Sequence, residues 1–180
     1  MLRASLLGLC LALPVHAVVA QGTAQGTQVP LAGFKTDPSA PIQVTADKLQ
    51  VNQADGTALF SGNVIVGQGK MRLSADKVHV TYAKASDGQK GKIQTLEASG
   101  GVTLVTSPAE AAQSKTAVYT LEDGTVVMTG SVLLTQGQNV LSGQKLVVNL
   151  RSGVGTMEGR VTTTLQPSTA PKAAPKAKTP

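Results

Sequence analysis

Aromatic side chains are nearly absent from this sequence, whose 180 residues include two Phe, two Tyr and no Trp. A surface that binds nucleic acid normally combines a dense basic face with aromatic rings on which the bases stack. The formal net charge of +6 is modest, and Lys172, Lys176 and Lys178 near the C-terminus carry part of it. The composition therefore argues against nucleic acid as a partner.

Cysteine and histidine are also scarce. Cys10 is the single cysteine, and it lies inside an apolar run after Leu9, whereas a lipoprotein signal places the cysteine after a small residue. Beyond residue 20 the chain has no thiol, and His79 is the one histidine. We therefore predict no disulfide, no metal site and no cofactor, so that stability must come from packing.

The N-terminal residues have the three parts of a secretory signal peptide. Arg3 supplies the positive charge, residues 4–13 are apolar, and small residues follow up to Ala20. The apolar run is shorter than the roughly 20 residues that cross a bilayer. We predict that residues 1–20 are a signal peptide, cleaved after Ala17 or Ala20, and that the chain is exported.

Two further segments lack the pattern of a folded domain. Residues 21–40 are rich in Gly, Thr, Gln and Pro, and residues 167–180 consist mainly of Ala, Pro and Lys. Such compositions are typical of disordered chain. Residues 41–166 are instead dense in Val, Leu and Thr, with frequent turn residues and no sustained helical spacing. We expect this stretch to be one all-β domain between two disordered ends.

One pattern occurs four times within the predicted domain. Each copy runs through two segments of alternating polarity to a glycine that is followed two residues later by a valine. One copy alone has too few apolar residues to offset the entropy of ordering its chain, so the copies are expected to stack. The second copy is longer, which places an insertion between residues 83 and 92. The copies begin at Ala46, Ala75, Ser114 and Gly143, and their glycines are Gly62, Gly100, Gly130 and Gly159.

A turn signal lies at the same place in three of the copies. These signals are Asp55-Gly56, Asp123-Gly124 and Ser152-Gly153. A tight hairpin requires a positive φ that glycine adopts without a Cβ clash. Each copy is therefore expected to contain a β-hairpin.

The alternation assigns one apolar face to every copy, which we expect to point inward between two facing layers. A β-jelly roll or a stacked open sandwich of antiparallel strands fits this pattern. The inward residues are mostly slim aliphatics, which either line a groove for acyl chains or simply fill the core. The candidates are Leu49, Val51, Phe60, Val64, Val66, Val78, Val80, Leu96, Val102, Leu104, Tyr119, Leu121, Met128, Val132, Leu134, Leu146 and Val148.

Side chains that could perform catalysis do not form a recognisable set. His79 lies between two inward valines and is therefore expected to face solvent. Asp47 and Asp76 occupy the same position in two copies, which is more typical of a structural bend than of an acid/base pair. Residues 67–70 resemble a phosphate-binding loop, but no helix follows them. We predict no catalytic residue and no enzymatic activity.

Both ends of the domain resemble unprotected sheet edges. Residues 42–46, with Ile42 and Val44, and residues 161–165, with Val161 and Thr163, contain neither a charge nor a proline. Pairing of two unlike edges is head to tail and propagates a chain of subunits. The alternative is that the flanking segments fold over these edges and cap them.

Four stretches have the pattern of a known family: residues 41–44, 60–66, 74–78 and the Met128-Thr129-Gly130 motif. They resemble the OstA-like N-terminal domain family of lipopolysaccharide transport proteins. The resemblance implies a V-shaped β-jelly roll that holds the acyl chains of lipid A, with an interior tyrosine–leucine pair at Tyr119 and Leu121. It also implies a periplasmic location and head-to-tail self-association. The implied partners are an LptC-like protein at the inner membrane and an LptD-like protein at the outer membrane, and the energy comes from an ATPase.

Sister components of this family share the fold. An LptC-like protein would keep an uncleaved membrane anchor, and an LptD-like protein would continue into a large barrel. The predicted signal peptide and the short C-terminal tail favour the LptA-like type. A structural or adhesive β-repeat scaffold with a dry core, or an LptC-like component, is the alternative.

Overall fold

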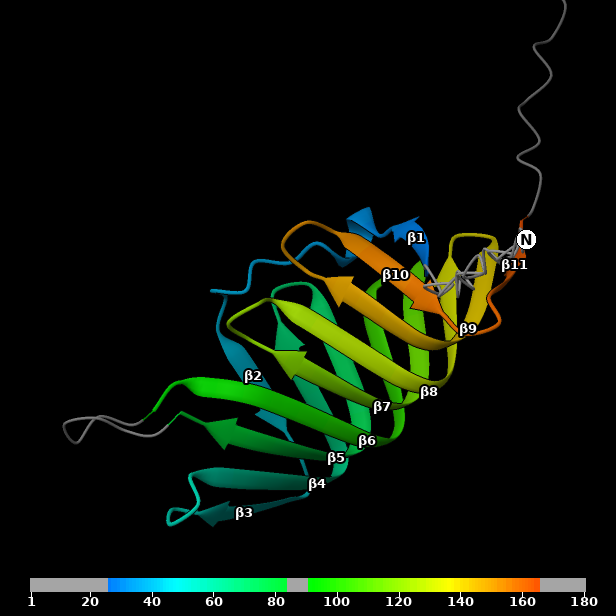
Figure 1. Cartoon of the computed structure of the whole chain (residues 1–180). Coiled ribbons are helices and arrows are strands. Elements are labelled where there is room, and N and C mark those ends of the chain that lie inside the picture. Colours follow the sequence, from blue (N-terminus) through cyan, green and yellow to red (C-terminus); the bar gives the residue numbers. More distant parts are fainter. Residues whose placement is uncertain (1–25, 84–90, 166–180) are drawn as a thin grey trace, which may run out of the picture.

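The computed structural model describes residues 26–83 and 91–165, which form an 11-stranded antiparallel sheet and one 3-10 turn, η1 (Figure 1). Within these ranges no helix is long and apolar enough to cross a bilayer. The elements are β1 (Thr27–Pro30), η1 (Ala32–Phe34), β2 (Ile42–Thr45), β3 (Lys48–Asn52), β4 (Thr57–Gln68), β5 (Met71–Tyr82), β6 (Ile93–Ser107), β7 (Glu110–Thr120), β8 (Thr125–Gln136), β9 (Asn139–Asn149), β10 (Val154–Glu158) and β11 (Thr162–Thr164).

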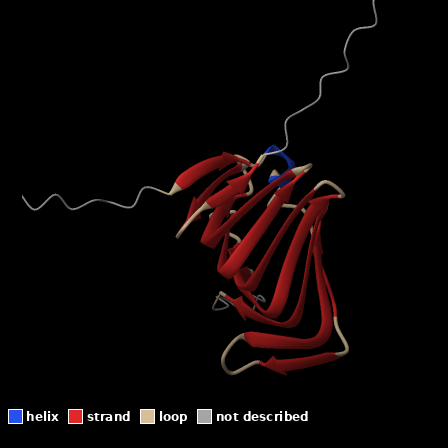
Figure 2. Ribbon diagram, turned by 90° about the vertical axis from the view of Figure 1, so that its right-hand side faces the viewer, coloured by secondary structure: helices blue, strands red, loops and turns tan. Residues whose placement is uncertain are grey.

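The six long strands β4 to β9 pair in sequence order, each with the next. Each of them crosses a bend, so the sheet folds into two facing walls (Figure 2). The bend divides each of the strands β4 to β9 into two halves. The first wall contains β1, β3, β10 and the halves that lie on their side of the bend, and the second wall contains β2, β11 and the other halves. The predicted all-β jelly roll is thus confirmed, and its two layers belong to one open sheet.

A β-bulge in each repeat produces the bend. At Gly62-Asn63 the pairing with β5 shifts register, and both residues have positive φ. A Cβ at Gly62 would lie 2.9 Å from the Cβ of Asp47, so glycine is required for space as well as for backbone conformation. In the other three copies the corresponding glycine is also followed by a residue with positive φ, at Gly100-Gly101, Gly130-Ser131 and Gly159-Arg160.

The predicted hairpin glycines adopt the expected conformation. Gly56, Gly124 and Gly153 have φ of 63°, 62° and 69°. Asn52 and Asn149 close two of these turns in the same way, because each side-chain oxygen accepts hydrogen bonds from two backbone amides within the turn. The sequence repeat is therefore a repeat of strand, turn, strand and bulge.

The N-terminal segment differs from its prediction. Residues 21–40 were expected to be disordered, yet β1 pairs with β10, and Leu31 and Phe34 are fully buried. Isolated apolar residues among Gly, Gln and Pro show no period, but here they bury against the far end of the sheet. Pro30 is compatible with β1 because β1 is an edge strand.

Several predicted segments lie outside the described residues. These are the signal peptide 1–20, residues 21–25, most of the insertion between 83 and 92, and the tail 167–180.

Candidate functional site

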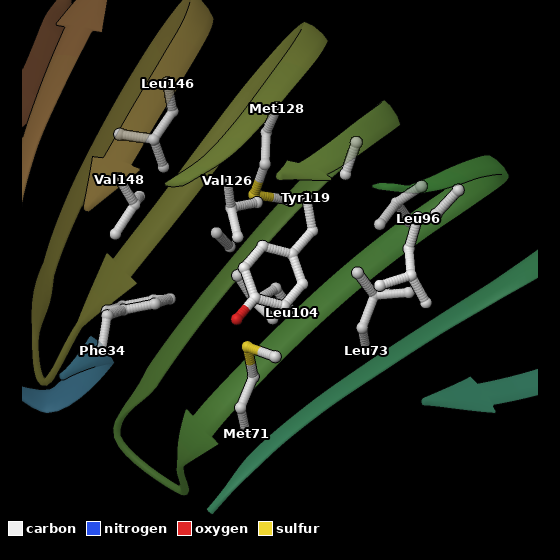
Figure 3. Close-up of a cluster of buried hydrophobic side chains, with 14 of the residues drawn as sticks. Phe34, Met71, Leu73, Leu96, Leu104, Tyr119, Val126, Met128, Leu146 and Val148 are labelled. Atoms are coloured by element: carbon white, nitrogen blue, oxygen red, sulfur yellow. The ribbon is translucent and has the colours of Figure 1, made fainter. Parts of the chain in front are cut away.

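The apolar interior between the two walls collects most of the predicted inward residues. Their side chains form rows that cross the strands of each wall, as in the row that joins Ala58, Val80, Leu96, Tyr119 and Val126. Figure 3 shows Leu96, Tyr119 and Val126 of this row. Phe60 and Leu121 are half-buried against this interior. The buried candidates are Val64, Val66, Val78, Val80, Leu96, Val102, Leu104, Tyr119, Met128, Val132, Leu134, Leu146 and Val148.

Leu49 and Val51 were also expected to point inward, in a groove or in the core, and they differ from the other candidates in their exposure. They pair with Phe60 and Ala58, so they belong to the inward rows, yet they remain 55% and 62% exposed. They lie on β3, at the end of the first wall, where the sheet is not covered by the opposite wall (Figure 1). The interior is therefore open at this end.

The interior is tightly filled in the middle and hollow at its margins. Between the walls, the space beside Val78, Leu96 and Tyr119 is about 10 Å³, no more than roughly one water. An open pocket of about 600 Å³, the end pocket, is lined by β3, the start of β4 and Tyr82. A second pocket of about 870 Å³, the mouth pocket, lies between residues 38–42 and the first-wall turns.

One buried hydrogen bond interrupts the apolar interior. The Tyr119 hydroxyl donates to Oε1 of Gln68, 3.0 Å away, and joins the two walls. Burial raises the pKa of Tyr119 above its ordinary value of 10.0, although the bond to Gln68 and the charge of Arg151 oppose this rise. The hydroxyl therefore stays protonated as a donor at neutral pH.

Sequence reasoning missed part of this interior. Met71 and Leu73 continue the alternation of β5 on the other side of its bulge, a signal that the sequence contained. Gln68 was missed because a glutamine in a strand is normally exposed, and Leu31 and Phe34 because their segment has no period.

The predicted edge residues lie at opposite ends of the second wall. Ile42 and Val44 are on β2, which pairs with β4 and has no other partner among the described strands. Thr163 is on β11, which pairs with β9, whereas Val161 precedes this strand and packs on the core. On the first wall, β1 pairs along β10, an edge that was not one of the two predicted ones.

The residues considered for catalysis or metal binding lie at the bulges or on the outer face of the sheet. Asp47 accepts a hydrogen bond from Asn63 at the first bulge, and Asp76 faces the second bulge. His79 alternates with two buried valines and faces outward. No cluster of three potential metal ligands occurs among the residues that the structure describes.

Comparisons with known proteins agree with this architecture. Residues 43–154 match the family model described as "LptA/(LptD N-terminal domain) LPS transport protein". The chain is 31% identical to the lipopolysaccharide export system protein LptA of Escherichia coli K12, over 78% of each chain. It is 32% identical to the uncharacterized protein R00383 of Rhizobium meliloti, over 83% of this chain and 84% of that protein.

The fold also matches a crystal structure of LptH from Pseudomonas aeruginosa, described as the LptA-homologous periplasmic component of a lipopolysaccharide transport device. The TM-score is 0.62 at 21% identity, covering 73% of this chain and 99% of LptH. Proteins of the matched family are non-enzymatic transport components. The two-walled sheet and the sequence match together show that the chain belongs to the LptA/LptD N-terminal domain family of lipopolysaccharide transport proteins.

Proposed function

We propose that this chain binds lipopolysaccharide by holding the acyl chains of lipid A between its two walls, and carries it across the periplasm as one unit of a bridge. The observation that carries this proposal is the apolar interior, which is continuous from the buried rows to the exposed Leu49 and Val51. Acyl chains have no hydrogen-bonding groups, so a ligand site for them consists of aliphatic surface.

The composition of the interior supports an acyl ligand over a polar one. Val, Leu, Met and Ala dominate the buried set, and Tyr119 with Gln68 is the buried hydrogen-bonded side-chain pair among the described residues. Exposure of apolar surface to water is unfavourable by roughly 25 cal/mol per Å². Contact with a lipid chain would remove the surfaces of Leu49, Val51 and the half-buried Phe60 from water, and this burial would favour binding.

Head-to-tail assembly is supported by the second wall. Val44 on β2 and Thr163 on β11 lie at the two ends of one inward row that also contains Val66, Leu104 and Leu141. If β11 of one copy pairs with β2 of the next, the row continues from copy to copy. LptC-like and LptD-like partners would occupy the two ends of such a stack.

Photo-crosslinking tests the interior as the lipid site. Phe60 and Leu59 are neighbours on β4, both half-buried, and they face opposite sides of the sheet. A benzoylphenylalanine at Phe60 should capture lipopolysaccharide, and one at Leu59 should not, because only the first side chain lies on the inner face. The measurement is immunoblotting of periplasmic material after irradiation of cells that produce each variant.

Equal capture at both positions would reject an interior lipid site. Absence of capture at Phe60 and at Tyr119 would favour the alternative of a β-repeat scaffold with a dry core. N-terminal sequencing of the periplasmic material would show in the same experiment whether cleavage follows Ala17 or Ala20.

A further inference from the structure

The segment between β1 and β2 crosses the mouth of the two walls. We call residues 31–40 the strap. Figure 1 shows it in blue, running from η1 along the side where the hairpin turns lie, down to β2. It contacts both walls, because the amides of Leu31 and Thr36 donate to the carbonyls of Gly153 and Leu150 in the first wall. The carboxylate of Glu110, in the second wall, occupies the position that a Cβ at Gly33 would take.

Two strap side chains fill part of the interior. Leu31 and Phe34 have no exposed surface. Figure 3 shows the Phe34 ring projecting from the strap toward the cluster that contains Val148, Leu104 and Tyr119. These three residues are candidates for contact with acyl chains, so Phe34 occupies space that a bound chain would need.

The strap is attached less firmly than the strands that it covers. It has no ladder of strand pairing, and its backbone is bound to the walls by isolated hydrogen bonds. The Gln68 amide adds two more, as its Nε2 donates to the carbonyls of Pro38 at 2.9 Å and Ala40 at 3.1 Å. The buried Thr36 hydroxyl has no partner among the described residues, which makes its burial costly. A segment with so few bonds opens at lower free energy than a central strand.

From these contacts we infer that the strap is a displaceable gate, which must leave the mouth before the interior can accept a lipid chain. The inference rests on the proposed function. With the strap in place, the cavity beside Val78, Leu96 and Tyr119 is about 10 Å³, which is too small for an acyl chain. Residues 38–40 also border the mouth pocket, together with Ile42 and Leu121. Displacement of the strap joins this pocket to the space that Leu31 and Phe34 leave.

A reversible disulfide tests the gate. The variant Gly33→Cys/Glu110→Cys, with Cys10→Ser, places two thiols where the Glu110 side chain now touches Gly33. The matched control is Thr103→Cys/Gln113→Cys with Cys10→Ser, which joins the paired strands β6 and β7 and leaves the strap free. Each variant is assayed oxidised and reduced with two probes: fluorescent rough-type lipopolysaccharide, and the small apolar dye N-phenyl-1-naphthylamine.

For the strap variant, oxidation should weaken binding of both probes by at least about tenfold, and reduction should restore it, since locking makes the open state rare. The control should bind equally in both states. Equal lipopolysaccharide binding by the oxidised and reduced strap variant would overturn the gate and leave the proposed function standing. If the oxidised strap variant binds the dye more weakly than the reduced one, and no variant binds lipopolysaccharide, the gate would be supported and the proposed ligand rejected.

Discussion

Tyr119 and Gln68 form a polar link inside an otherwise apolar interior. Tyr119 comes from the first wall, and Gln68 from the end of β4 in the second wall. Gln68 also binds the strap through Nε2. A single glutamine therefore connects both walls and the N-terminal segment, and its amide is satisfied on both sides.

Removal of the tyrosine hydroxyl should weaken this link. Tyr119→Phe leaves Gln68 Oε1 buried without its donor, which should lower the free energy of unfolding by about 1–3 kcal/mol. Chemical denaturation monitored by circular dichroism measures this change. Tyr82→Phe, at the end of β5, is the control and should change stability by less than about 0.5 kcal/mol. An equal loss in both variants would contradict the assigned role of the bond.

The raised pKa of Tyr119 predicts a dependence on alkaline pH. Its folded-state pKa lies above the ordinary value of 10.0, so the folded protein holds this proton more tightly than the unfolded chain. The stability that this provides is complete below pH 10 and is lost as the pH rises through the folded-state pKa. Unfolding measured between pH 8 and pH 11 should show a steeper alkaline decline in wild type than in Tyr119→Phe. Identical declines in stability would show that burial does not raise the pKa of Tyr119.

At the scale of the element, the bulge is the unit that the sequence repeats. Each bulge has a first glycine that faces a side chain of the neighbouring strand, followed by a second positive-φ residue. The second position is Asn63, Ser131 or Arg160 in three copies, so it accepts a side chain. The first position is glycine in all four.

Adjacent glycines in the second bulge allow a matched test. A Cβ at Gly100 would lie 2.6 Å from the Cβ of Asp76, whereas nothing lies within 4 Å of a Cβ at Gly101. Gly100→Ala should lower the free energy of unfolding by about 2 kcal/mol or more, because it adds a clash to the cost of a positive φ. Gly101→Ala should cost about 1 kcal/mol. Thermal and urea unfolding compare them, and a larger effect at Gly101 would contradict this account of the bend.

At the scale of the whole molecule, the two walls end differently. The second wall ends on β2 and β11 and the first wall on β3 and β1, and no described strand pairs with their outer sides; β1 differs from β2 and β11 in containing Pro30. Paired across two copies, β11 and β2 would run antiparallel and continue the alternation of strands β4 to β9. Because Pro30 has no N–H to donate to a further strand, we place the junction between copies in the second wall, where neither β2 nor β11 contains a proline.

A charge on the inner face of that junction should prevent assembly. Thr163 is exposed and pairs with the buried Leu141, so Thr163→Lys leaves the monomer folded but places an ammonium group in the continued inward row. Gln113→Lys, on an exposed outer position of β7, is the control. Sedimentation velocity over a range of concentrations should show oligomers for wild type and the control and their loss in Thr163→Lys. Oligomers that persist in Thr163→Lys would place the junction elsewhere.

The sequence by itself determined the repeat, the hairpins and the inward rows. All of these depend on local properties: alternation of polarity, and glycine where φ is positive, as at Gly56 and Gly124. Burial was a different matter. Leu49 and Val51 have the pattern of core residues and are exposed, while Leu31 and Phe34 have no pattern and are fully buried.

Only the tertiary structure decided these four positions, because burial depends on which surface covers a residue. Leu49 and Val51 on β3 are left uncovered although β2 extends the second wall beyond β4, whereas Leu31 and Phe34 are buried where the strap packs on the walls. The same holds for Gln68, whose polarity predicts exposure but whose partners, Tyr119 and the strap carbonyls, come from distant parts of the chain. The spacing of residues along the chain therefore predicts the strands and turns, whereas packing between distant segments decides which side chains the interior contains.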